Sequence, residues 1–168
     1  MKPYLYILAV LLVGGGIGYF IGEKSAILER TSQELGEARQ NDDSSVRQIL
    51  SEQVEAYRLH DSMLLFRDCA NSYVEIDGIT GEASGLERSV LASYEVFRAG
   101  QSVAFNLKDI DVKVFHNSAI ARAAYSKTSE LFEKRGVTGL TGQGLWIMSK
   151  SAGKWQIDAF WRIEESKK

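Results

Sequence analysis

The chain has 168 residues, which suffices for one ordinary domain with an extension and is too short for two large cores. Its formal net charge of -2 lacks the basic excess that binding to a phosphate backbone requires, so we expect no nucleic-acid partner. The single cysteine, Cys69, excludes an intramolecular disulfide and a cysteine-based metal cluster. Because His60 and His116 lack partners at ligand spacing, we expect neither a metal ion nor a cofactor.

An apolar segment opens the chain. No charged residue lies between Tyr4 and Gly22, and these nineteen residues, at ~1.5 Å each in a helix, nearly span a hydrocarbon core of ~30 Å. We therefore predict a single-pass membrane anchor over residues 1–22. A cleaved signal peptide is the alternative, but the usual Ala-x-Ala exit is missing. The three-residue tail before the segment is similar to that of a bacterial signal anchor, which places the rest of the chain in a periplasmic or other extracytoplasmic compartment.

Three glycines of this segment share one helical face. Gly14, Gly18 and Gly22 recur every four residues, a spacing that lets a second helix approach closely. The pattern predicts self-association of two anchors and favours a homodimer. The alternative is that glycine is simply common in membrane helices.

A helical stalk follows over residues 23–43. It is rich in helix formers, but its apolar stripe is too short to establish a coiled coil. The polar run 41–45 predicts a break, with Ser45 as the N-cap of a new helix and Gln48 as its capping-box partner. A folded domain over residues 44–168 is therefore expected.

Three helices are predicted at the start of this domain. The first has one apolar face that includes Val46, Leu50 and Tyr57, and Asp61 can cap a short second helix that continues towards Cys69. A strand is predicted over 73–77. The third helix ends at Gly100, and the residues of its inward face are expected to be Leu86, Val90, Tyr94 and Phe97.

The remaining sequence alternates as β-strands. Apolar residues occupy odd positions up to Leu107 and even positions from Ile110, so a β-bulge is predicted at 108–109. In the last strand one face carries Trp155, Ile157, Ala159, Trp161 and Ile163. Phe160 falls on the opposite, mostly polar face. We expect that face to be the outer surface of the sheet and to mediate self-association.

Three helices followed by a bent antiparallel meander predict an α+β cone. The order resembles the nuclear transport factor 2-like superfamily, particularly its SnoaL-like and ketosteroid-isomerase-like branch. The segments that carry the resemblance are Ala56-Tyr57-Arg58-Leu59-His60-Asp61, Tyr73-Val74-Glu75-Ile76-Asp77-Gly78, Gly142-Gln143-Gly144-Leu145-Trp146 and Gly153-Lys154-Trp155-Gln156-Ile157-Asp158. The resemblance implies a curved sheet wrapped around the first helix, and a pairing of domains through the sheet surface.

The resemblance also suggests where chemistry would lie. Isomerases of this kind carry a carboxylate near the end of the first strand, where Glu75 and Asp77 stand, and a tyrosine near Gln53. Because Val74 and Ile76 are the apolar face of that strand, we expect both carboxylates to face solvent, and we assign no catalytic residue. The aromatic residues that could line the mouth of the cone are Tyr57, Tyr73, Phe97, Phe105, Tyr125, Trp146 and Trp161.

Two functions fit these patterns. The preferred hypothesis is a membrane-anchored, non-catalytic binding or assembly module that presents the domain to a protein partner or a small apolar ligand. The alternative is an isomerase, hydrolase or cyclase that acts on a small hydrophobic substrate in the cone. A buried carboxylate facing a cavity would favour the enzyme.

Overall fold

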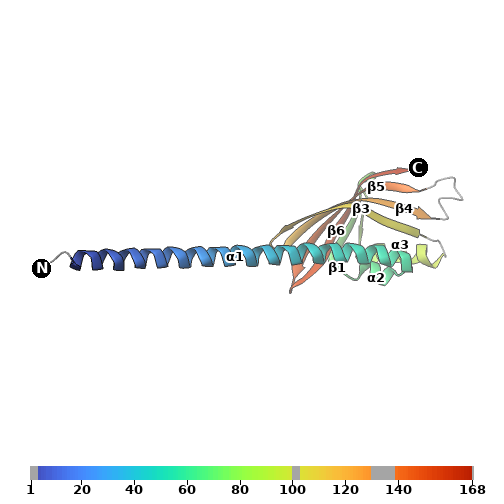
Figure 1. Cartoon of the computed structure of the whole chain (residues 1–168). Helices are drawn as coiled ribbons and strands as arrows, with labels where there is room; N and C mark the ends of the chain where they lie inside the picture. Colours follow the sequence, from blue (N-terminus) through green and yellow to red (C-terminus); the bar gives the residue numbers. More distant parts are fainter. Residues whose placement is uncertain (1–3, 100–102, 130–138, 168) are drawn as a thin grey trace. The chain divides into compact units, whose positions relative to one another are not determined.

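The computed structural model describes residues 4–99, 103–129 and 139–167, with side chains described within residues 30–163. The chain divides into two compact units, Met1–Asn41 and Asp42–Lys168. The described part of the first unit is entirely helical and belongs to α1, which runs over Tyr4–Leu59 (Figure 1). Residues 4–22 of the predicted membrane segment, which include Gly14, Gly18 and Gly22, belong to α1, and their side chains are not among those described. Among the residues whose side chains the structure describes, no helix has the length and apolar character needed to cross a bilayer.

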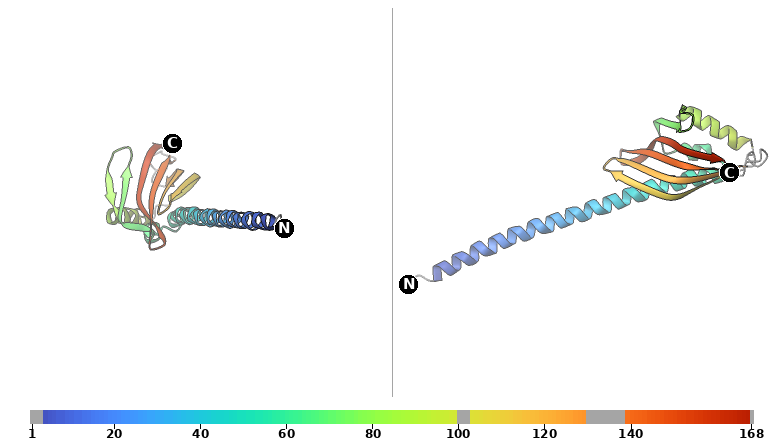
Figure 2. Two further views of the ribbon diagram at one scale, coloured as in Figure 1. Left: turned by 90° about the vertical axis from the view of Figure 1, so that its left-hand side faces the viewer. Right: turned by 90° about the horizontal axis from the view of Figure 1, so that it is seen from above.

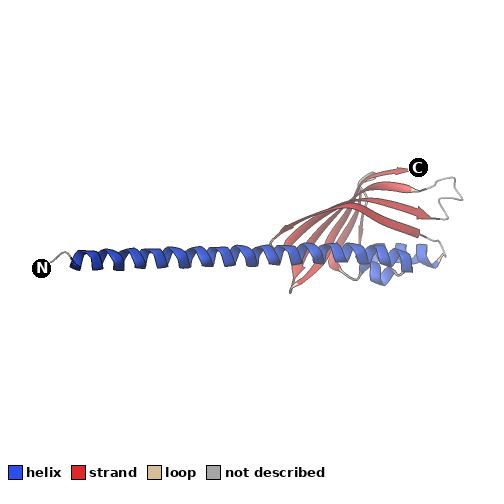
Figure 3. Ribbon diagram, viewed as in Figure 1, coloured by secondary structure: helices blue, strands red, loops and turns tan. Residues whose placement is uncertain are grey.

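The second unit is an α+β domain. After the end of α1 come α2 (Ser62–Phe66), β1 (Cys69–Asp77), β2 (Ala83–Gly85) and α3 (Leu86–Arg98). Four long strands follow: β3 (Val103–Phe115), β4 (Ser118–Ser129), β5 (Leu140–Ser151) and β6 (Lys154–Lys167). The strands form one curved sheet with the helices on its concave side (Figure 3).

The sheet is mixed, and the predicted all-antiparallel arrangement was wrong. Its strand order is β2-β1-β6-β5-β4-β3, and β1 runs parallel to β6. The prediction considered only hairpins between consecutive strands. In the structure β1, which lies between α2 and α3 in sequence, pairs with the edge of β6 that is not bonded to β5. Figure 2 shows β1 and β2 at one end of the sheet with α3 beside them.

Irregular pairing decides which side chains enter the cone. The bulge predicted at 108–109 is confirmed: the β3–β4 register shifts between Lys108 and Asp111, and Asp109 adopts a φ of 53°. Two shifts in β5–β6 were not predicted, and one of them leaves Asp158 opposite no partner between Ile157 and Ala159. Because side chains alternate along a strand, this extra residue reverses the inward parity of the residues that follow it, up to the second shift between Arg162 and Glu164.

The reversed parity splits the predicted inner face of β6. Trp155 and Ile157 are buried, as predicted, at 5% and 1% exposure. Trp161 was predicted on the same face but is 42% exposed, so that assignment was wrong. Phe160 was predicted on the outer face and instead lies inside the cone. Neither reversal is visible in the alternation of residue types.

The core joins α1 to the middle of the sheet. Val46 and Leu50 of α1 are fully buried and belong to one cluster with Trp146 and Met148 of β5. The neighbouring strand β4 contributes small buried side chains from Ala119, Ala121 and Ala123. Small residues beside the large ones of β5 leave room for the side chains of α1, which allows the helix and the sheet to pack closely.

The predicted helix break at 41–45 was wrong, because both acidic side chains have partners compatible with a helix. Asp43 forms an i,i+4 ion pair with Arg47 at 2.7 Å. Asp42 accepts hydrogen bonds from Lys150 Nζ at 2.5 Å and from Trp155 Nε1 at 3.0 Å. These contacts replace the local side-chain-to-backbone bonds that would have ended the helix. They also fix α1 against the β5–β6 hairpin.

Helices α2 and α3 agree with their predictions in part. Asp61 caps α2, as predicted, and its carboxylate accepts from the backbone N–H groups of Met63 and Leu64. Cys69, predicted to continue that helix, is the first residue of β1 and is buried. In α3, Phe97 faces inwards as predicted. Tyr94 was predicted on the same face but is 50% exposed, and Leu91 is also exposed, at 57%.

Candidate ligand-binding site

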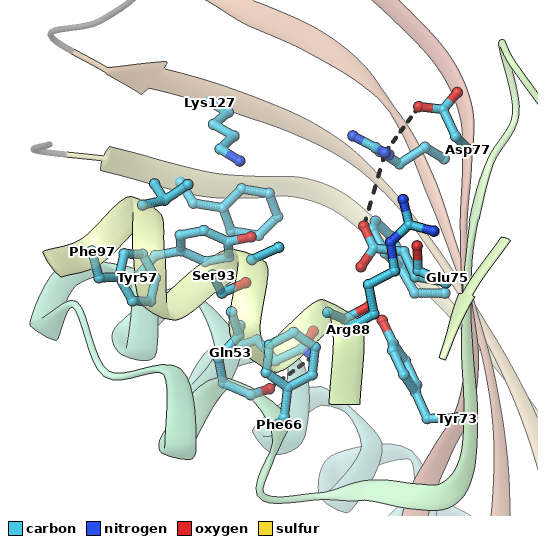
Figure 4. A pocket seen from close by; sticks show the side chains of 18 of the residues that line it. Gln53, Tyr57, Phe66, Tyr73, Glu75, Asp77, Arg88, Ser93, Phe97 and Lys127 are labelled. Atoms are coloured by element: carbon cyan, nitrogen blue, oxygen red, sulfur yellow. Dashed lines mark hydrogen bonds and ion pairs between the residues drawn. The ribbon is translucent and has the colours of Figure 1, made fainter. Parts of the chain in front are cut away.

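The cone encloses a cavity of about 340 Å³ between its helices and the concave face of the sheet. Its lining comes from α1, α2 and α3 on one side and from all six strands of the sheet on the other (Figure 4). A volume of this size is at the lower end of the range of small-molecule sites, which is ~300–1,000 Å³. Apolar rings cover one part of the wall and charged side chains another.

A pair of stacked rings forms the apolar wall on the sheet side. Trp146 of β5 and Phe160 of β6 lie with their ring centroids 4.7 Å apart and their planes at 30°. Gly144 makes this stacking possible, because a Cβ at that position would come within 2.6 Å of the Trp146 ring and 2.9 Å of Phe160. The local sequence Gly-x-Trp on β5 therefore has a packing function.

A second aromatic group lies at the other end of the cavity. Tyr57 of α1 contacts Phe97 edge-on at 5.6 Å and Phe105 of β3 at 4.7 Å between ring centroids. The ammonium group of Lys127 lies 5.4 Å from the Tyr57 ring centroid, within the range of a cation–π contact. The Tyr57 ring is thus held on several sides while its hydroxyl group points into the cavity (Figure 4).

Gln53 links the helical and sheet walls. Its Oε1 accepts a hydrogen bond from Trp146 Nε1 at 3.0 Å, and its Nε2 donates to the backbone oxygen of Leu65 at 3.4 Å. Both ends of the amide are therefore engaged. Gln53 occupies the position where the resemblance to isomerases implied a tyrosine, and here it supports the wall of the cavity.

The charged part of the cavity is built on the end of β1. Arg162 donates to Asp77 Oδ2 at 2.9 Å and lies 4.0 Å from Glu75 Oε1. Asp77 Oδ1 also accepts from the backbone N–H groups of Ile79 and Thr80 in the following turn. The bonds from Thr80 and Ile79, with the charge of Arg162, hold the pKa of Asp77 below its ordinary value despite some burial. Asp77 is therefore an ionised structural anchor.

The orientation predicted for the two carboxylates was wrong. Tyr73, Glu75 and Asp77 line the cavity, and Val74 and Ile76 occupy the alternate positions. The prediction treated the apolar residues as the inner face. In β1 the face that is turned into the cone is the one that carries Glu75 and Asp77.

The buried phenols are protonated over a wide pH range. Burial, assisted by the negative charge of Glu75, raises the pKa of both Tyr57 and Tyr73 well above the ordinary value. They therefore remain hydrogen-bond donors. Burial also raises the pKa of the Cys69 thiol to about 12, with Asp68 and Glu75 adding to the effect, so this cysteine is not a reactive thiolate.

Five of the aromatic residues predicted for the mouth of the cone line this cavity: Tyr57, Tyr73, Phe97, Phe105 and Trp146. Tyr125 lies behind it, stacked on Phe105 at 6.0 Å, and Trp161 faces outwards. Phe160 was proposed for self-association and is instead a cavity residue.

Sequence reasoning missed several residues of the lining. Arg162 and Phe160 were missed because the β6 bulge reverses their side of the sheet. Ser89 and Ser93 were missed because the opposite face of α3 has the larger side chains. The four-residue spacing of these serines was the available signal. Among the described residues no cluster of three or more His, Cys, Asp or Glu side chains could hold a metal ion.

Comparisons with known proteins show the fold. No protein-family model matches the sequence, and no curated protein does. Among solved structures, a protein of unknown function from Mycobacterium tuberculosis aligns with a TM-score of 0.65 at 11% identity, over 77% of this chain and 75% of its own. A nuclear transport factor 2-like protein of unknown function from Pseudomonas putida gives 0.64 at 16%, over 73% and 86%.

A third structure, named as a candidate aromatic ring hydroxylase from Novosphingobium aromaticivorans, gives a TM-score of 0.61 at 14% identity over 76% of this chain and 94% of its own. The second unit thus has the nuclear transport factor 2-like fold, a cone with a cavity on the concave face of its sheet. At these identities the similarity establishes the fold and leaves the ligand to be argued from the residues.

Proposed function

We propose that the protein is a membrane-anchored binding module whose nuclear transport factor 2-like domain, of the SnoaL-like kind, holds a small amphipathic molecule in its cone. The observation that carries the proposal is the composition of the cavity, where stacked rings meet a charged cluster. Small-molecule sites combine an apolar wall with a few fixed polar groups in this way. The small apolar ligand expected from the sequence is thereby refined to one with a polar end.

The anchor is proposed from the sequence alone. The uncharged run between Tyr4 and Gly22 is long enough for one span, and it would hold the domain at an extracytoplasmic membrane surface. Mass spectrometry of the membrane-extracted protein tests this part. An intact N-terminus supports an uncleaved anchor, whereas a mature N-terminus near residue 25 would contradict it.

The cavity can be tested by filling it. Ser93 lies on the cavity wall, so Ser93→Phe should occupy the space that a ligand needs. The matched control is Ser51→Phe on the exposed face of α1. A fragment library screened by ligand-observed NMR should contain ring compounds that bind the full-length protein and the control but not Ser93→Phe. The proposal fails if no fragment binds at millimolar concentration, or if Ser93→Phe binds the same fragments as the control.

One observation favours the alternative enzyme. Glu75 points into the cavity, where a general base of an isomerase, hydrolase or cyclase could reach a substrate. Against it, Asp77 is committed to Arg162 and the turn, and both ends of Gln53 are engaged, so neither of these two residues can act as a second catalytic group beside Glu75. If Glu75→Gln abolished a measured turnover while ligand affinity and unfolding temperature were unchanged, the enzyme would replace the binding module.

A further inference from the structure

The face of α3 that is turned into the cavity carries two serines beside apolar residues, and large apolar side chains also lie on the face turned away from it. Ser89 is buried at 4% exposure and Ser93 lies one turn later on the cavity wall. On the other side, Leu91 is 57% exposed and Tyr94 is 50% exposed. Burying hydroxyl groups while exposing large apolar side chains lowers stability. Such an arrangement is expected where function requires it.

The hydroxyl group of Ser89 is buried without a partner among the described residues. Its Oγ is buried and makes no hydrogen bond to any residue that the structure describes. A serine within a helix often bonds to the backbone carbonyl one turn earlier, but this one does not. A buried hydroxyl group without a partner costs free energy that a bound molecule would recover.

The surroundings of Ser89 are rich in donors. Arg88, which precedes it on α3, also lines the cavity and makes no ion pair with any carboxylate among the described residues. The neutral phenols Tyr57 and Tyr73 add two O–H donors. Two of the hydrogen-bond acceptors in the cavity wall are already engaged by protein donors: Asp77 accepts from Arg162, and Gln53 Oε1 accepts from Trp146.

The N-terminal end of α3 adds an electrostatic field that favours an electronegative group. Its N-cap, Gly85, supplies no side-chain hydrogen bond, and Ser84 just before it lines the cavity. The N-terminal end of a helix carries partial positive charge that stabilises electronegative groups nearby. Glu75 and Glu82 also line the cavity and oppose this field, so they are the groups that would favour a cationic ligand instead.

We infer that the ligand of the proposed binding function is a ring compound bearing a carbonyl or carboxylate oxygen, which accepts hydrogen bonds from Ser89 and Arg88 while its ring lies against Trp146 and Phe160. This inference rests on the proposed function and adds the chemical class of the ligand. A carbonyl and a carboxylate both offer an acceptor oxygen. Arg88 distinguishes between them, because its positive charge strengthens a hydrogen bond to the carboxylate more than one to the neutral carbonyl.

Three ring-matched probes test the inference by calorimetry on the full-length protein in detergent: 2-naphthoate, 2-acetonaphthone and 2-naphthylmethylamine. At least one of the two acceptor probes should bind tighter than the amine. Ser89→Ala should weaken that acceptor probe roughly tenfold, the loss of one buried hydrogen bond. If 2-naphthoate is the better acceptor, Arg88→Gln should weaken it more than it weakens the ketone.

Thermal unfolding supplies an independent readout. Without ligand, Ser89→Ala should raise the Tm by about 2 °C beyond Ser51→Ala, because it removes an unsatisfied buried group. Ser51 lies exposed on α1 and controls for the higher helix propensity of alanine. A hydroxyl group with only a structural role would lower the Tm when removed.

The outcomes separate the two proposals. If the amine binds as tightly as both acceptor probes, or if Ser89→Ala leaves acceptor affinity unchanged, the ligand class is wrong while the cavity remains a binding site. If none of the probes binds and the fragment screen also finds nothing, the binding function fails together with the inference.

Discussion

The indole nitrogen of Trp146 donates to Oε1 of Gln53 across 3.0 Å, and this bond joins β5 to α1 at the wall of the cavity. Trp146 is 1% exposed, so its N–H group has no access to water when the bond is lost. The same tryptophan stacks on Phe160. One residue thus belongs both to the core and to the candidate site.

Replacing Gln53 by leucine should therefore destabilise the domain. The change keeps the side chain near its original size but leaves the Trp146 N–H unsatisfied, which costs about 1–3 kcal/mol. Urea unfolding monitored by circular dichroism measures the loss. Gln48→Leu, on the exposed part of the same helix, is the control and should change stability by less than about 0.5 kcal/mol.

The two tryptophans of β6 should respond differently to truncation. Trp155 is 5% exposed, so Trp155→Ala should cost ~3–5 kcal/mol through the cavity that it leaves. Trp161 is 42% exposed, and Trp161→Ala should cost well under half as much. Equal losses in unfolding free energy would contradict the parity reversal at Asp158.

Acid should weaken the contact between α1 and the β5–β6 hairpin. Burial alone would raise the pKa of Asp42, but the hydrogen bonds from Lys150 and Trp155 outweigh it and hold the pKa below 3.8. Because the folded-state pKa is the lower one, the contribution is complete above about pH 5 and is lost as the pH falls through the folded value. Asp77 acts in the same direction.

Asp42→Asn isolates this contribution. The variant should lose about 1–2 kcal/mol at pH 7, because a neutral amide binds Lys150 more weakly. It should also show a shallower decline of Tm between pH 5 and pH 2 than the unmodified protein. A parallel decline in both proteins would mean that other carboxylates dominate the acid response.

Pairing of two domains through the outer sheet surface remains a prediction, but Phe160 is no longer expected at the contact. Phe160 lies in the cavity, but the outer sheet surface carries exposed Ile120, Ile147 and Trp161 on three adjacent strands. Ile120 pairs with Ile147 in the β4–β5 ladder. We expect Ile147→Lys to weaken self-association by at least tenfold, measured by sedimentation of the full-length protein in detergent. An unchanged oligomeric state would remove this surface from consideration.

Much of the fold was predictable because it depends on periodicity. The apolar face of the first domain helix, the cap at Asp61 and the bulge at 108–109 all follow from residue spacing. What was missed depends on tertiary contacts. The acidic run at 42–43 stays helical because Lys150 and Trp155 lie more than a hundred residues away in sequence.

The candidate site was only half predictable for the same reason. Aromatic residues on inward positions could be proposed for the cavity from their strands and helices. The polar residues could not, since a bulge at one residue brings Arg162 inside and the inner face of α3 buries Ser89 while Leu91 stays exposed. Both departures from simple patterning occur at the cavity, which agrees with a functional origin.

The most direct test of binding in the cone uses the three tryptophan indole N–H groups as NMR probes. Trp146 lines the cavity, Trp155 bonds to Asp42, and Trp161 faces outwards, and single Trp→Phe variants assign their signals. Titration of the tightest ring compound found should shift the Trp146 signal while the Trp161 signal stays in place. A shift at Trp161 with Trp146 unmoved would contradict the account, because the ligand would then occupy the outside of the sheet and not the cone.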